Sequence, residues 1–128
     1  MSNRINISSG AKWEDIVGYS RACRIGNTVE VTGTVSLKDG KPYGVGDPYV
    51  QTRRIIEIIE ETLQKAGAEL EDVLRTRIFV TEIDQWEAVG KAHHEFFHTI
   101  KPTTTMVEVS KLISPEFMVE IEATAIVQ

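Results

Sequence analysis

Three histidines, His93, His94 and His98, lie close together in a sequence of 128 residues and could do chemistry. His93 falls in the apolar stripe of an expected helix, where a histidine is either a hydrogen-bonded core residue or a general base. His94 and His98 are four residues apart, a spacing that could admit a metal ion. No clear third ligand is evident in the sequence. We therefore predict no metal site and no cofactor.

Polar side chains on the expected strands form a second set of candidates. Tyr19 and Arg21 are two residues apart, so their side chains share one face of an extended segment. The Tyr19 hydroxyl could lie at the mouth of a cleft, or the ring could be an ordinary interface aromatic. Glu120 could orient a water molecule, or it could pair with Arg75 or Arg77 across a sheet.

Several large enzyme classes are excluded by missing motifs. The sequence contains no serine nucleophile elbow, Walker loop, Rossmann glycine fingerprint or zincin motif. Cys23 is the only cysteine, which excludes an internal disulfide and favours a small buried side chain over a catalytic thiol. The net charge is −5 and no basic stripe occurs, which argues against a nucleic-acid partner.

Length and composition are those of one globular domain spanning residues 1–128. The hydrophobic fraction is 41%, and no apolar run approaches the roughly 20 residues needed to cross a bilayer. The first ten residues lack the apolar region of a secretory signal. We therefore expect a soluble, cytoplasmic protein without a membrane partner.

The N-terminal half is predicted to form a hairpin, a loop and a helix. Tyr19 to Ile25 and Thr28 to Val35 are extended runs separated by Gly26-Asn27, a pair that suits a two-residue turn. Lys38 to Gly46 is interrupted by glycine and proline and is expected to be a loop at the rim of any cleft. Asp47 then caps a helix that begins at Pro48 and stops at Gly67.

The C-terminal half is predicted to add a strand, a helix and two closing strands. A turn from Thr81 to Asp84 precedes the second helix, which carries an apolar stripe and ends before Lys101-Pro102. The apolar stripe of this helix consists of Trp86, Val89, His93, Phe96 and Phe97. The expected strands are Val73 to Val80, Thr103 to Val109, Phe117 to Val127 and a short one near Ile5. This order predicts an α+β fold in which two helices cover one face of a mainly antiparallel sheet of about six strands.

The uncovered sheet face is predicted to carry both charges and large apolar groups. On this face we expect Glu30, Thr32, Thr34, Arg75, Arg77, Phe79, Thr104, Met106, Glu108, Met118, Glu120 and Glu122. Such a mixture is commoner on a polar oligomer interface than on a bare sheet face. We therefore predict contact between subunits there.

Several segments of the chain resemble the Rid family (YjgF-like, reactive intermediate deaminases). The resemblance spans nearly the whole chain, and its most specific part is the closing pair, Met106-Val107-Glu108-Val109 and Val119-Glu120-Ile121-Glu122-Ala123. The other matching segments are Gly18-Tyr19-Ser20-Arg21-Ala22, Val31-Thr32-Gly33-Thr34, Phe79-Val80, Phe96-Phe97 and Lys101-Pro102-Thr103-Thr104-Thr105.

The resemblance implies a chorismate-mutase-like fold assembled as a homotrimer, with small-molecule clefts between subunits. It also implies hydrolysis of 2-imino acids to 2-keto acids and ammonia without a metal or organic cofactor. Tyr19 matches the family's cleft tyrosine, and Gly33 matches the glycine whose backbone lines the substrate site. Glu120 matches the carboxylate that positions the attacking water.

Three positions depart from the family pattern. The substrate-clamping arginine falls on Thr104, the usual asparagine of the second helix on Gly90, and the cleft cysteine on Met106. A threonine hydroxyl offers one neutral donor where arginine offers two charge-assisted hydrogen bonds. An imino-acid complex should therefore be weaker by several kcal/mol, unless Arg21 serves as a displaced clamp.

The substrate-binding residues we predict are therefore Tyr19, Arg21, Gly33, Thr104 and Met106, with Glu120 as the catalytic residue. The leading function is a trimer that handles a small metabolite, through hydrolysis of an imine, enamine or related C–N substrate. A binding or protein-protective module without turnover is the alternative. Cleavage of RNA, proposed for some relatives, fits poorly with the acidic charge balance.

Overall fold

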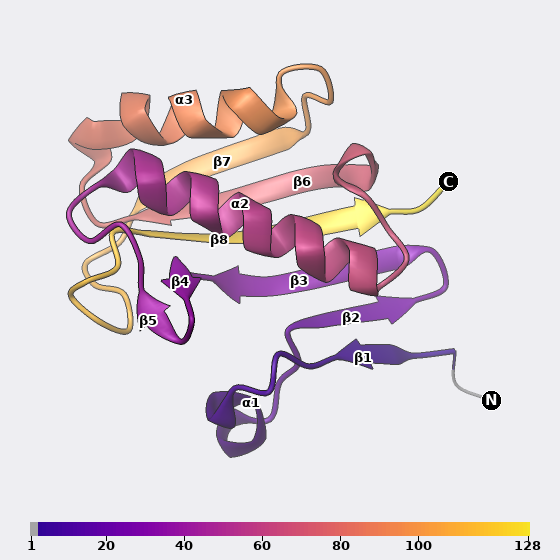
Figure 1. Cartoon of the computed structure of the whole chain (residues 1–128). Coiled ribbons are helices and arrows are strands. Elements are labelled where there is room, and N and C mark those ends of the chain that lie inside the picture. The colour runs from indigo at the N-terminus through magenta and orange to yellow at the C-terminus, as the bar shows by residue number, and fades with distance from the viewer. Residues whose placement is uncertain (1–2) are drawn as a thin grey trace.

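The computed structural model describes residues 3–128 as a six-stranded sheet with two long helices packed on one side (Figure 1). The strands of this sheet are β1 (Ile5–Ile7), β2 (Ala22–Ile25), β3 (Thr28–Thr34), β6 (Val73–Val80), β7 (Thr103–Glu108) and β8 (Val119–Ile126). The long helices are α2 (Pro48–Lys65) and α3 (Trp86–Phe97). The predicted α+β fold class is confirmed.

The sheet has the strand order β1-β2-β3-β8-β6-β7. Neighbouring strands are antiparallel except β6 and β7, which run parallel. The connection between these two parallel strands contains α3, as a parallel crossover requires. The strand β7 is consequently one edge of the sheet and lies beside α3.

Local sequence signals explain the first half of the sheet and its covering helix. Gly26 has φ +58°, as the tight turn between β2 and β3 needs. The Asp47 side chain accepts a hydrogen bond from the Val50 backbone N–H at 3.1 Å, which confirms the predicted cap. The inner stripe of α2 is buried, and its fully buried members are Ile55, Ile56, Ile59 and Leu63.

Several small elements differ from the prediction. A short helix, α1 (Lys12–Val17), precedes the sheet and was not predicted. The expected loop from Lys38 to Gly46 includes part of a two-stranded ribbon of β4 (Leu37–Lys38) and β5 (Lys41–Pro42), closed by a turn at Asp39 and Gly40. The 3-10 turns η1 (Leu70–Asp72) and η2 (Ile83–Gln85) flank β6. These pieces are too short to give a periodic hydrophobic pattern.

Irregularities in two strands overturn part of the predicted face assignment. The register of β3 against β8 shifts between Val31 and Thr34, which buries Thr34 on the helix side. The register of β6 against β8 shifts between Val73 and Arg75, which buries Val73 and leaves Leu74 exposed. One extra residue in a strand changes which side of the sheet the side chains on either side of it point to. Strict alternation was therefore wrong at these places.

The apolar stripe of α3 is narrower than predicted. Val89, Ala92 and Phe97 are buried, whereas Trp86 is 55% exposed. His93 is half-buried and its ring lies 4.6 Å from that of Phe97. Helix α3 therefore places a histidine at the border between the core and solvent.

A buried glutamine joins two loops to the long helix. Gln51 is fully buried, and its Nε2 donates to the carbonyl oxygens of Gly44 and Glu116. Its Oε1 accepts from the backbone N–H of Met118 at 2.9 Å. The loop before α2 and the segment before β8 are thus fixed by one side chain.

Replacing Gln51 with methionine should lower the free energy of unfolding by about 3 kcal/mol, because three backbone groups lose their hydrogen-bond partner at similar side-chain volume. Urea denaturation followed by circular dichroism measures the change. Gln64→Met, on an exposed position of the same helix, should change stability by less than about 0.5 kcal/mol. Equal effects of the two substitutions would contradict the role assigned to Gln51.

Candidate functional site

The predicted site residues fall into two groups on opposite sides of the sheet. Glu120 lies between buried Val119 and Ile121 on β8, so its side chain faces away from the helices. Thr104 aligns with buried Thr76 across the parallel pair of β6 and β7, so it faces the helix side. We name the two sets the Glu120 group (Tyr19, Arg21, Gly33, Glu120) and the Thr104 group (Thr76, Gly90, His93, Thr104).

The placement of Thr104, Met106 and Glu108 on the uncovered face is therefore wrong. In the observed register Thr103 and Thr105 lie opposite Arg75 and Arg77, and Met106 lies opposite buried Ile78. Met106 packs against the hydrophobic core on the helix side. The predicted sides of Arg75 and Arg77 on β6 are correct, so the error is in the side assigned to β7, which only its pairing with β6 determines.

Gly33 and Glu120 are in direct contact. A Cβ atom at Gly33 would overlap the side-chain carboxyl group of Glu120. The φ of Gly33 is not in the left-handed region, so space, not backbone conformation, accounts for glycine at this position. The Glu120 carboxyl group therefore lies directly against the β3 backbone.

The environment of Glu120 favours its protonated form. Burial raises the pKa of this carboxyl, the nearby Glu122 raises it further, and Arg21 acts in the opposite direction. A carboxyl group whose pKa lies above its ordinary value is better able to accept and return a proton near neutral pH. These are properties that a group orienting and activating water would need.

Arg21 supports the backbone of β3. Its Nη2 donates to the carbonyl oxygen of Gly33 at 2.7 Å and to that of Thr32 at 3.2 Å. Burial lowers the pKa of Arg21, while Tyr19, Glu14 and Glu120 act to raise it. Both hydrogen bonds use one nitrogen of the guanidinium, and the buried Nε has no hydrogen-bond partner within residues 3–128. Arg21 as a displaced carboxylate clamp therefore stays a prediction.

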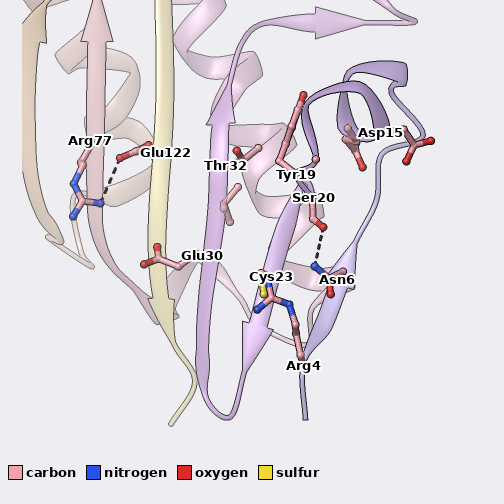
Figure 2. Close-up of a pocket in the computed structure, with 13 residues that line it drawn as sticks. Arg4, Asn6, Asp15, Tyr19, Ser20, Cys23, Glu30, Thr32, Arg77 and Glu122 are labelled. Atoms are coloured by element: carbon pink, nitrogen blue, oxygen red, sulfur yellow. Dashed lines mark hydrogen bonds and ion pairs between the residues drawn. The ribbon is translucent and has the colours of Figure 1, made fainter. Parts of the chain in front are cut away.

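Tyr19 lines an open hollow of about 750 Å³ on the uncovered face (Figure 2). It precedes β2, which begins at Ala22 and not at Tyr19 as predicted. Charged side chains lie across the hollow, and Arg77 pairs with Glu122 at 3.6 Å. The expected mixture of both charge signs on this face is therefore present.

Three polar groups of the Thr104 group form a continuous hydrogen-bonded chain. The Thr76 Oγ1 lies 2.9 Å from the His93 Nε2 and 2.8 Å from the Thr104 Oγ1. Thr76 is 1% exposed, so both of its polar neighbours are needed to satisfy a buried hydroxyl. Helix α3 and the parallel strands β6 and β7 each contribute one member.

His93 is neutral at physiological pH. Burial lowers its pKa to about 4, which disfavours the imidazolium. Of the two predicted roles, that of a hydrogen-bonded core residue describes its contacts. His94 and His98 are exposed, and their rings stack with centroids 5.3 Å apart.

No group of three or more histidine, cysteine, aspartate or glutamate side chains within residues 3–128 could hold a metal ion. Over the same residues, no helix is both long and apolar enough to cross a membrane.

The chain from His93 through Thr76 to Thr104 was missed by sequence reasoning. Thr76 is buried on the helix side of β6 and bonds to His93 and Thr104. The sequence feature that could have indicated this chain is a polar residue, Thr76, at a core position of a strand, followed by a histidine, His93, on the inner face of the next helix. Such a pair needs mutual hydrogen bonding when buried.

Comparisons with known proteins agree with this α+β architecture. A family model described as "Endoribonuclease L-PSP" matches residues 10–127. A RutC family protein of Pyrococcus abyssi is 33% identical over 108 residues, which are 84% of either chain.

Two solved structures carry the same fold. The crystal structure of a Mycobacterium tuberculosis protein, described as a member of the YjgF/YER057c/UK114 family, matches with a TM-score of 0.89 and 49% identity over 98% of this chain and 100% of that one. A Yersinia pestis protein of the conserved Rid family matches with a TM-score of 0.83 and 28% identity over 95% and 94%.

The fold defines a chorismate-mutase-like α+β protein with a six-stranded sheet and two covering helices. The chain belongs to the YjgF/YER057c/UK114 family, which includes the Rid and RutC proteins. Membership supports a role in small-molecule binding or deaminase-like chemistry.

Replacing Gly33 with alanine should move the Glu120 carboxyl group outward and lower its pKa toward the ordinary value of 4.5. The displaced group is the end of a flexible side chain, so the protein should remain folded. A carboxyl ¹³C NMR titration of Glu120 measures the shift. Gly90→Ala is the matched control, because its added Cβ would meet only Trp86 Cε3 at 3.9 Å. An unchanged Glu120 pKa in Gly33→Ala would refute the contact.

When the pH falls from about 6.5 to about 4, the free energy of unfolding should drop more in the wild type than in His93→Gln. The expected difference between the two drops is about 2 kcal/mol, because the half-buried imidazole is partly screened by solvent. The unfolded imidazole takes up a proton near its ordinary pKa of 6.5, whereas the folded one stays neutral until about pH 4. Stability is therefore complete above pH 6.5 and is lost as the pH falls. Urea denaturation at several pH values tests this, with His98→Gln expected to follow the wild type.

Proposed function

We propose that the protein is a homotrimer that binds a small molecule between subunits and hydrolyses a C–N bond of the imine or enamine type, with Glu120 positioning the attacking water. The observation that carries this proposal is the half-buried Glu120 carboxyl group, which lies against the Gly33 backbone and has a raised pKa. Tyr19, Gly33, Thr104 and Met106 are proposed as substrate-binding residues.

The separation of the two groups within one chain supports assembly. The Glu120 group faces away from the helices, and the Thr104 group lies beside α3 at the sheet edge. A cleft containing both groups therefore requires the edge of one subunit to meet the uncovered face of another. The mixed polar and apolar character of that face favours such a contact.

The proposed reaction needs few groups. Water adds to the electrophilic imine carbon, and Glu120 takes up the proton that the water loses. Glu120 gives this proton to the nitrogen, which forms a carbinolamine. The hydroxyl proton of the carbinolamine is then transferred through Glu120 to the nitrogen, the C–N bond breaks, and ammonia leaves as the carbonyl group forms. The site must hold the substrate beside Glu120 and exclude competing orientations.

Thr104 argues against a standard 2-imino acid as the preferred substrate. The Thr104 hydroxyl, His93 and Thr76 are uncharged at neutral pH, and Arg21 is bound to the backbone of β3. This feature also supports the alternative, a binding or protein-protective module without turnover. RNA cleavage, the activity in the name of the matching family model, is disfavoured by the net charge of −5.

Loss of freshly generated 2-iminopropanoate should be faster with the wild-type protein than in buffer, and Glu120→Gln should reduce the acceleration by about 100-fold. Thr104→Arg should increase the acceleration, because an arginine fork can bind the substrate carboxylate. Formation of ammonia and 2-oxopropanoate measures turnover. A wild-type rate equal to that in buffer would rule out this substrate, and an unchanged rate in Glu120→Gln where turnover occurs would refute the role of Glu120.

The solution mass provides a separate control on assembly. Light scattering of the same preparations should give about three times the 14.3 kDa of one chain. A single-chain mass at concentrations well above micromolar would contradict a cleft shared between subunits.

A further inference from the structure

A second pocket lies beside α3 and the edge strand β7. Its volume is about 370 Å³, and its lining includes Gly90, His93, Phe97, Pro102 and Thr104. Gly90 leaves space here, since the nearest atom to an added Cβ would be Trp86 Cε3 at 3.9 Å. The Thr104 side chain is exposed to this pocket, whereas its partner Thr76 is buried behind it.

The chain behind Thr104 can run in two directions, and neither carries a charge. If the His93 Nε2 bears the hydrogen, it donates to Thr76, Thr76 donates to Thr104, and the Thr104 hydroxyl is free to donate into the pocket. If Nε2 is bare, Thr104 donates to Thr76, Thr76 donates to His93, and Thr104 presents a lone pair. Within residues 3–128, the Thr104 hydroxyl has one further hydrogen bond, which it donates to the Pro102 carbonyl oxygen and which is long at 3.4 Å.

We propose, as an extension of the proposed function, that this pocket binds an uncharged polar group such as a carboxamide in preference to a carboxylate. Thr104 makes the contact, and His93, acting through Thr76, is the positioning residue. A carboxamide offers both a donor and an acceptor, which suits a hydroxyl that can act as either. A carboxylate offers acceptors alone and loses hydration without gaining a buried cation.

Lys101 is the one cation among the residues that line this pocket, and it is exposed. An exposed ammonium group on a flexible chain contributes little to ion pairing because water and salt screen it. His94 and His98 also line the opening from exposed positions. The half-buried part of the pocket, next to His93 and Phe97, therefore remains without a charge.

The test compares lactamide with lactate, which differ at the carboxamide and carboxylate groups. Ligand-observed NMR titrations at pH 7.5 use the full chain in its native assembly. Wild-type protein should bind lactamide about tenfold more tightly than lactate, the factor expected for one additional neutral hydrogen bond. Thr104→Val should remove this preference, and Thr104→Arg should reverse it.

Matched variants separate positioning from general damage. Thr105→Val alters the neighbouring threonine, whose hydroxyl contacts Arg75 on the other face of the sheet, and should retain the tenfold preference. His93→Leu should lose it, while His93→Gln should recover most of it by restoring a hydrogen-bonding group to Thr76. The lactamide-to-lactate ratio is the readout, since a loss of folding would weaken both ligands equally.

Equal or tighter binding of lactate by the wild type would overturn the inference and leave the proposed function standing, because the site would then be occupied by an acid. Loss of that lactate binding in Lys101→Gln would identify Lys101 as the missing cation, again against the inference. The inference would also be overturned if the wild type bound neither ligand but Thr104→Arg bound lactate. That result would still show that the pocket can hold a ligand. Failure of every variant to bind either ligand would count against the inference, and the Glu120 turnover assay would decide the proposed function separately.

Discussion

The pairing of β6 on both of its sides is the constraint on which the arrangement of the site depends. It runs antiparallel to β8, which carries Glu120, and parallel to β7, which carries Thr104. Phe79 lies opposite Glu120, and Thr76 lies opposite Thr104, so the two site residues are held in register with one strand. Because Thr76 and Phe79 are an odd number of residues apart, their partners face opposite sides of the sheet. A change in this register would alter both groups together.

The large elements could be predicted from the sequence because their signals are local and periodic. The spacing of Ile55, Ile59 and Leu63 gave α2, and Asp47 followed by Pro48 gave its beginning. The side to which some residues point could not be predicted, because it depends on irregularities in strand pairing. The shift between Val73 and Arg75 lies in the pairing with β8, far away in the sequence.

The contents of the candidate site were predictable to different degrees. Family resemblance identified Glu120, Gly33 and Thr104 as positions of interest, and the structure gives physical reasons for two of them. Gly33 leaves room for the Glu120 carboxyl group, and Thr104 ends a chain of hydrogen bonds that begins at His93. The sequence alone could not give these contacts, since each joins elements whose relative positions are set by tertiary packing.

The charges around the Glu120 group and the Thr104 group favour the same kind of ligand. Glu120 already lies near Glu122, and their mutual repulsion contributes to the raised pKa of Glu120. The Arg21 guanidinium donates to backbone carbonyl oxygens, and the Thr104 group is uncharged. An anionic substrate held between the two groups would add a further negative charge beside Glu120, where the half-buried Arg21 already donates two hydrogen bonds to backbone carbonyl oxygens. A neutral substrate avoids this repulsion, so the environment of Glu120 and that of Thr104 favour the same class of ligand.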